Sequence, residues 1–180
     1  MSADDEVSRL RVPPHSIEAE QSVLGGLLMD NGSWDRAAEL LSEADFYSHQ
    51  HRVIFAAIGS LVQRSKPADV VTVFERLQAI GKHQDAGGLA YLNALAQSVP
   101  SAGNMRRYAE IVRERSVLRK LIATSDEIAT AAFNTQGRDV AKILDEAGSK
   151  LTEVLDNDSA RAGEWAPMRD LVTQQLDAVN

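Results

Sequence analysis

The chain has 180 residues, of which 44% are hydrophobic and 25% are charged, and its formal net charge is −7. This composition is typical of a globular protein with one good core, and the absence of cysteine excludes disulfides, thiolate nucleophiles and zinc sites built on sulfur. The acidic amino terminus and the lack of a long apolar run exclude a secretory signal and a membrane span. We therefore expect a cytoplasmic protein, and the negative charge disfavours one whose whole surface binds nucleic acid.

Residues 1–12 are charged and poor in apolar anchors, which predicts a disordered tail, and Pro13-Pro14 closes it. Residues 13–103 then predict a helical head, a compact globule of about five short helices. Ser16, Ser33 and Asp69 are candidate helix N-caps within it. The five helices carry apolar residues at helical spacing around 17–28, 34–41, 53–62, 70–80 and 89–99.

The segment from Asp69 to Phe74 is rich in β-branched residues and has an alternative interpretation as a strand. We reject the strand because the apolar spacing at 70, 73, 74 and 77 continues past it as a helix would. No second strand is available in the sequence to pair with it. The fold class predicted for the whole chain is all-α.

Residues 104–157 predict a long helical hairpin. Neither glycine nor proline occurs between Gly103 and Gly137, and apolar residues recur at helical spacing over a length of roughly 45 Å. A second helix follows, with Asp139 as its possible N-cap, and should fold back on the first. The apolar stripe of the first arm is wider than one neighbouring helix would cover, so we expect the hairpin to pack against something outside its own chain.

Residues 158–167 have little to bury and predict a flexible linker. Residues 168–180 then recover an amphipathic pattern that is too short for a stable isolated helix. We interpret this helix as leading to a further domain, so that the 180 residues are a fragment of something longer.

No catalytic, cofactor or metal site is predicted. The only Gly-Lys pair, Gly81-Lys82, lacks the first glycine and the hydroxyl residue of a nucleotide-binding P-loop, and no Gly-x-Ser-x-Gly motif occurs. His49 and His51 are two apart and point to opposite sides of a helix, and Asp45 with His49 lacks a third metal ligand. Glu18 and Glu20 are interpreted as first-turn carboxylates that complement a helix dipole.

A run of basic residues lies on the first arm of the hairpin. We favour a solvated helix face with i, i+4 ion pairs to Glu110 and Glu114. The alternative is direct contact with a nucleic-acid backbone, in which binding would be sensitive to salt. The residues of this run are Arg106, Arg107, Arg113, Arg115, Arg119 and Lys120.

Four segments taken together resemble the amino-terminal domain of the bacterial replicative DNA helicase of the DnaB type. Their order and spacing fit from residue 13 to about 155, and residues 168–180 resemble the start of that family's linker helix. The segments are Pro13 to Gly25; Asp45-Phe46-Tyr47 with His51 and Ile54-Phe55; Pro67 to Thr72; and Gly87 to Leu92 continuing through Pro100, Asn104, Tyr108-Ala109, Ile111-Val112 and Leu118-Arg119.

The resemblance implies a non-catalytic collar domain that assembles the helicase hexamer through its hairpins and recruits primase during DNA replication. It implies no cofactor in this fragment, since ATP and Mg²⁺ belong to the parent's motor domain, and DNA is contacted by the full-length protein at replication forks near the nucleoid. For self-association we select Ile111, Leu118, Leu121, Phe133, Leu144 and Leu151. For a primase surface we select Glu18, Tyr91, Ile122 and Ile128, and for docking on a neighbouring motor domain Met168, Leu171, Val172 and Leu176.

Two other functions remain as alternatives. One is a direct nucleic-acid-binding helical module that uses the basic run. The other is the helicase-binding domain of a primase, whose fold resembles this one. The Pro13-Pro14 opening and the linker-like residues 156–180 favour the helicase side.

Overall fold

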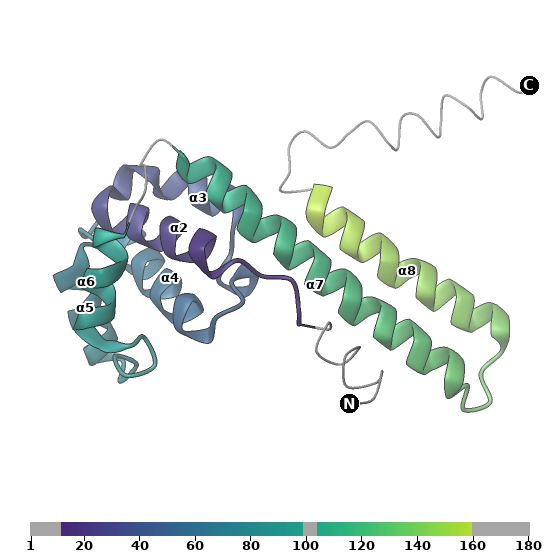
Figure 1. Cartoon of the computed structure of the whole chain (residues 1–180). Coiled ribbons are helices and arrows are strands. Elements are labelled where there is room, and N and C mark those ends of the chain that lie inside the picture. Colours follow the sequence, from purple (N-terminus) through teal and green to yellow (C-terminus); the bar gives the residue numbers. More distant parts are fainter. Residues whose placement is uncertain (1–11, 99–103, 160–180) are drawn as a thin grey trace, which may run out of the picture. The chain divides into compact units, whose positions relative to one another are not determined.

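The computed structural model describes residues 12–98 and 104–159, and within them every regular element is a helix (Figure 1). This confirms the all-α fold class. The α-helices are α2 (Ile17–Met29), α3 (Trp34–Leu40), α4 (His49–Val62), α5 (Val70–Ala79), α6 (Gly88–Gln97), α7 (Met105–Phe133) and α8 (Val140–Ser159), with short 3-10 helices η1 (Asn31–Ser33) and η2 (Glu43–Asp45).

Ser16, Ser33 and Asp69 each lie at the N-cap of a head helix, but the Ser33 side chain makes no capping bond. The Ser16 hydroxyl accepts the backbone N–H of Ala19, and the Asp69 carboxylate accepts those of Val71 and Thr72. These bonds satisfy backbone donors that have no partner inside their own helix. The segment after Asp69 is helical from Val70 onward, so the rejection of a strand there is confirmed.

Five α-helices, α2 to α6, form the head core together with the first turns of α7. Leucine, isoleucine and valine side chains from α2, α4, α5 and α6 are fully buried around Phe46, which follows η2. Trp34 lies so close to α4 that a Cβ added at Gly59 would be 2.6 Å from its ring. From α7 the core receives Met105, Ala109 and Val112.

The chain divides into two compact units between Arg119 and Lys120, within α7. The predicted boundary lay earlier, between residues 103 and 104. The observed division is later because Met105, Ala109, Val112 and Ser116 are buried in the first unit.

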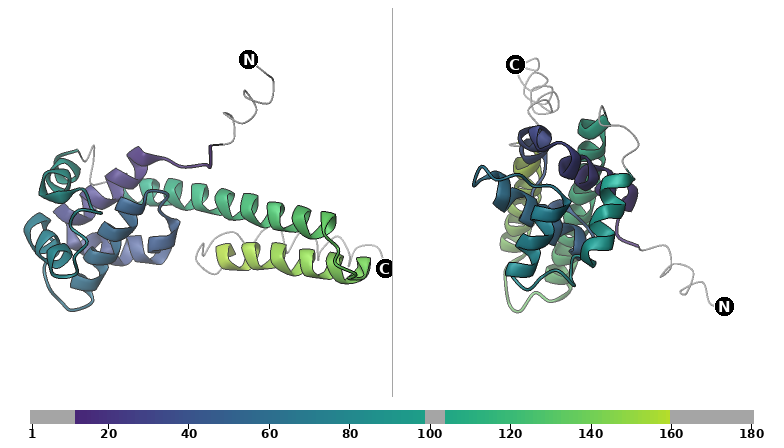
Figure 2. Two further views of the ribbon diagram at one scale, coloured as in Figure 1. Left: turned by 90° about the horizontal axis from the view of Figure 1, so that it is seen from below. Right: turned by 90° about the vertical axis from the view of Figure 1, so that its left-hand side faces the viewer.

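The second unit contains the rest of α7 and the antiparallel helix α8, which lie side by side in both Figure 1 and Figure 2. The turn between them uses left-handed backbone at Gln136 and Gly137, where φ is 50° and 75°. Lys150 of α8 donates to Glu127 of α7, and Arg138 in the turn donates to Glu146 at 2.7 Å. The predicted hairpin is therefore present.

Several predicted features fall outside the described residues. These are the tail up to residue 11, Pro100, nearly all of the 158–167 linker, and the 168–180 helix with Met168, Leu171, Val172 and Leu176. Helix α8 extends two residues past the predicted end of the hairpin, to Ser159. In the described part of the chain, no helix is both long and apolar enough to cross a membrane.

Candidate functional site

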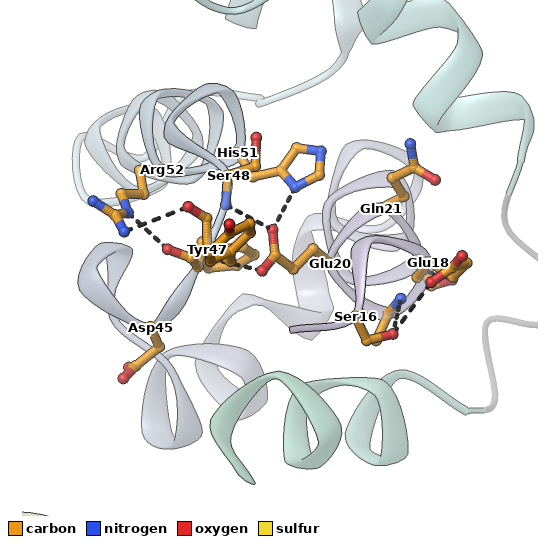
Figure 3. A network of polar contacts seen from close by, with 12 residues as sticks. Ser16, Glu18, Glu20, Gln21, Asp45, Tyr47, Ser48, His51 and Arg52 are labelled. Carbon is orange, nitrogen blue, oxygen red and sulfur yellow. Dashed lines mark hydrogen bonds and ion pairs between the residues drawn. The ribbon is translucent and has the colours of Figure 1, made fainter. Parts of the chain in front are cut away.

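A buried polar network joins three helices of the head, and Figure 3 shows the part of it that links Glu20 to Tyr47, Ser48 and His51. Glu20 of α2 is 1% exposed, and its Oε2 lies 2.6 Å from Nδ1 of His51 of α4. The other ring nitrogen of His51, Nε2, lies 2.7 Å from the hydroxyl of Tyr91 of α6. Gln21 donates to that hydroxyl at 3.2 Å, and the Glu20 carboxylate also accepts the backbone N–H groups of Tyr47 and Ser48.

One assignment of hydrogens satisfies every member of this network. The Gln21 amide donates to the Tyr91 oxygen, the Tyr91 O–H donates to His51 Nε2, and the His51 Nδ1–H donates to Glu20. Glu20 lies in the first turn of α2, as predicted, but its side chain is buried. Its position places it on the apolar stripe of α2 with Val23, Leu24 and Leu27, so the carboxylate is buried and needs partners.

The network does not form a metal site. Among the described residues, no group of three or more His, Asp or Glu side chains is arranged to hold an ion. Asp45 is buried, and it accepts the Ser42 backbone N–H at 2.8 Å and the Ser116 hydroxyl at 2.7 Å. His49 is exposed. Asp45 thus bonds to the backbone at the start of η2 and links η2 to α7.

Two arginines of the basic run bind main-chain oxygens inside the head unit. Arg113 is 8% exposed and donates to the Leu40 carbonyl at 3.0 Å. Arg119 donates to the carbonyls of Pro14 and Asp45 at 2.7 and 2.5 Å, and its guanidinium lies over the Tyr47 ring. Burial lowers the pKa of Arg119, and the nearby Glu20 carboxylate opposes this shift. Both arginines therefore serve the head's own structure.

The remaining members of the run are exposed. Arg106 pairs with Glu110, and Arg107 pairs with both Glu110 and Glu114. This is the predicted solvated face with ion pairs along one helix. Arg115 and Lys120 are also exposed.

Most of the predicted self-association residues are exposed apolar side chains. Phe133 is 88% exposed and Leu144 is 68% exposed, and Leu118, Leu121 and Leu151 are exposed by about two-fifths. Ile111 differs, because it packs against the head core and is half-buried.

The four predicted primase-surface residues lie in both units. Glu18 on α2 and Ile122 on α7 are exposed, whereas Ile128 is half-buried. Tyr91 is also half-buried, and its hydroxyl is engaged by His51 and Gln21. A partner can therefore reach only part of the Tyr91 ring.

Comparisons with known proteins agree on one family. The model of the DnaB-like helicase N terminal domain matches residues 12–114. The replicative DNA helicase DnaB of Haemophilus influenzae is 42% identical over 86% of this chain and 33% of the relative. That of Geobacillus stearothermophilus is 40% identical over 94% of this chain and 37% of the relative. The chain thus spans about a third of the length of these curated relatives.

Solved structures show the same fold. The N-terminal domain of DnaB helicase from Mycobacterium tuberculosis superposes with a TM-score of 0.75 at 36% identity, covering 79% of this chain and 99% of that one. A DnaB-like replicative helicase, described together with its interactions with primase, superposes with a TM-score of 0.64 at 22% identity over 92% of this chain and 36% of that one. The family model and the Mycobacterium structure together show that this chain belongs to the DnaB-like helicase N-terminal domain family.

Proposed function

We propose that this chain is the collar domain of a hexameric replicative DNA helicase, in which it holds subunits together and recruits primase. The chain itself is non-catalytic in this proposal, and ATP and Mg²⁺ are handled by a motor domain of the parent protein. Family membership and the absence of a P-loop from the sequence support this assignment.

The observation that carries the assembly role is the surface of the hairpin. Residues 117–156 are all described, and none of them is buried. A pair of helices without a buried side chain gains little from its own packing, because most helix stability comes from burying an apolar face. The exposed Phe133, Leu144 and Leu155 supply the apolar area that a second copy would cover.

Leu144→Asp is the sharpest test of this seam. Leu144 is 68% exposed, so the substitution removes little packing within the chain. We expect light scattering to show an oligomer for the unmodified chain and a smaller species for Leu144→Asp. Val71→Asp is the matched control, because Val71 on α5 is 61% exposed and lies in the head. A monomeric unmodified chain, or equal effects of the two substitutions, contradicts the assembly role.

Recruitment of primase is the second part of the proposal. One relative of the same fold is described with its interactions with primase. The candidate contact residues that are accessible here are Glu18 and Ile122, with parts of Tyr91 and Ile128.

Calorimetry with the carboxy-terminal helical domain of primase tests this role. Ile122→Asp and Glu18→Lys are each expected to weaken binding, while Val71→Asp leaves it unchanged. Light scattering on each variant separates a lost primase contact from a lost assembly. Unchanged affinity in both Ile122→Asp and Glu18→Lys places the primase contact elsewhere.

A further inference from the structure

A groove of about 430 Å³ opens on the head between η2, α4 and the carboxyl end of α5. Three cationic side chains line it, Arg52 from α4, Arg76 from α5 and Lys82 from the following loop, against one carboxylate, Glu43. His49 lies at the same groove. The local charge is therefore positive in a chain whose net charge is −7, and such an inversion concentrates anions at this point of the surface.

Arg76 also shows an unmet hydrogen-bonding need. Its Nε is buried and has no hydrogen-bond partner among the described residues. Buried N–H groups almost always have an acceptor, because leaving one unpaired is unfavourable. His83 Nδ1 is in the same condition but does not line the groove. An oxyanion in the groove would give the Arg76 guanidinium an acceptor beside it.

The rest of the lining limits what such a ligand is. Ala56, Ala57 and Ile80 form an apolar wall, and Ser60 adds a hydroxyl. Pockets of about 300–1,000 Å³ typically hold small molecules, and an oxyanion alone would fill only part of this groove. A ligand that matches this lining therefore has an anionic group for the cationic side chains and an apolar group for the wall.

We propose that this groove binds a small organic phosphate. Arg76 and Lys82 hold its phosphate oxygens, and its organic part lies on the apolar wall. Arg52 is less available, because its Nε donates to the Phe46 carbonyl at 2.7 Å and an Nη donates to that of Tyr47. Glu43 repels a second anionic group and so limits the charge of the ligand. An acidic peptide offers the same kind of oxyanion, but the groove has a volume of about 430 Å³, which is the size of a small-molecule pocket.

Phenyl phosphate is a suitable probe because it joins one phosphate to one apolar ring. Titrated into the full 180-residue chain and followed by ¹H–¹⁵N spectra, it is expected to shift amides of α4, α5 and the Lys82 loop, and to bind more tightly than inorganic phosphate. Arg76→Gln and Lys82→Gln are each expected to weaken binding roughly tenfold, the scale of a lost charge-assisted hydrogen bond. Arg64→Gln is the control, because Arg64 is exposed and does not line the groove.

Lys82 is exposed, so Lys82→Gln keeps the test valid even where Arg76→Gln disturbs the fold. The proposal is overturned if phenyl phosphate shifts the same amide signals equally in Lys82→Gln and Arg64→Gln. It is also overturned if phenyl phosphate shifts no amide signals of the unmodified chain. Tighter binding of an Asp-Asp-Glu peptide than of phenyl phosphate assigns the groove to a protein partner and also overturns it. The proposal is supported if the affinity for phenyl phosphate is lower in Lys82→Gln, is unchanged in Arg64→Gln and decreases with added salt.

Discussion

At the scale of single residues, Glu20 organises the head. Its carboxylate accepts the backbone N–H groups of Tyr47 and Ser48, which directly precede α4, and the N–H of the His51 ring in the first turn of α4. The Ser48 side chain makes no capping bond, so a residue of α2 satisfies backbone donors near the start of α4. Tyr91 then extends the same network to α6.

Replacing Glu20 with Gln should destabilise the head strongly. An amide keeps the size of the side chain but offers only one acceptor oxygen, and its NH₂ would face N–H donors. We expect the free energy of unfolding to fall by about 2–4 kcal/mol, the range for leaving buried polar partners unsatisfied. Urea denaturation followed by circular dichroism measures this loss.

Glu18 provides the matched control for that substitution. It lies in the same first turn of α2 but is exposed, so Glu18→Gln should change stability by less than about 1 kcal/mol. Losses of similar size for the two variants would show that the Glu20 network contributes little beyond the helix dipole.

The sequence indicates that Glu20 and His51 are buried, although polar residues of these types are usually exposed. Glu20 is followed by Val23, Leu24 and Leu27, and His51 by Ile54, Phe55 and Ile58, so both polar residues occupy the apolar stripe of their helix. Periodicity could therefore predict that they are buried. It could not predict that they pair, because the packing of α2 against α4 sets which buried groups meet.

At the scale of elements, α7 has two kinds of arginine. Arg113 and Arg119 lie on the part of α7 that belongs to the head unit and bind main-chain carbonyls of the head. Arg106 and Arg107 face solvent and pair within the helix. Helices, caps and core stripes were predictable here because they depend on local spacing, whereas the two kinds of arginine look alike in sequence and differ only in tertiary contacts.

This difference predicts that removing the charge destabilises the head at Arg119 and has almost no effect at Arg106. Arg119→Gln should lower the free energy of unfolding by about 1.5–3 kcal/mol, because two carbonyl oxygens lose a charged donor. Arg106→Gln should change it by less than about 0.5 kcal/mol, since an exposed pair on one helix contributes little. Chemical denaturation of both variants checks this, and equal losses would contradict the assignment of Arg119 to the head's structure.

The exposed members of the run also test direct binding to nucleic acid. Neutralising Arg106, Arg107, Arg115 and Lys120 together should leave the affinity for a single-stranded oligonucleotide unchanged. Strong, salt-sensitive binding by the unmodified chain that this variant loses would instead favour the nucleic-acid function.

At the scale of the whole molecule, the two units differ in what stabilises them. The head has a core of fully buried side chains drawn from α2, α4, α5 and α6. The second unit has ion pairs at its surface and no buried side chain from residue 120 to residue 156. Surface ion pairs contribute little free energy, so the stability of α7 beyond Arg119 and of α8 should depend on other copies of the chain.

Thermal unfolding should therefore depend on protein concentration. A ligand that binds only the folded state stabilises it by mass action, and here the ligand is another copy, so raising the concentration about a hundredfold should raise Tm by a few degrees. Circular dichroism of dilute and concentrated samples measures the shift. Leu144→Asp should remove this dependence while the head-surface control Val71→Asp retains it, because only Leu144 lies on the hairpin. A Tm that stays constant with concentration in the unmodified chain would mean that the hairpin is stable without a partner copy, and the exposed apolar residues of α7 and α8 would then need a different partner.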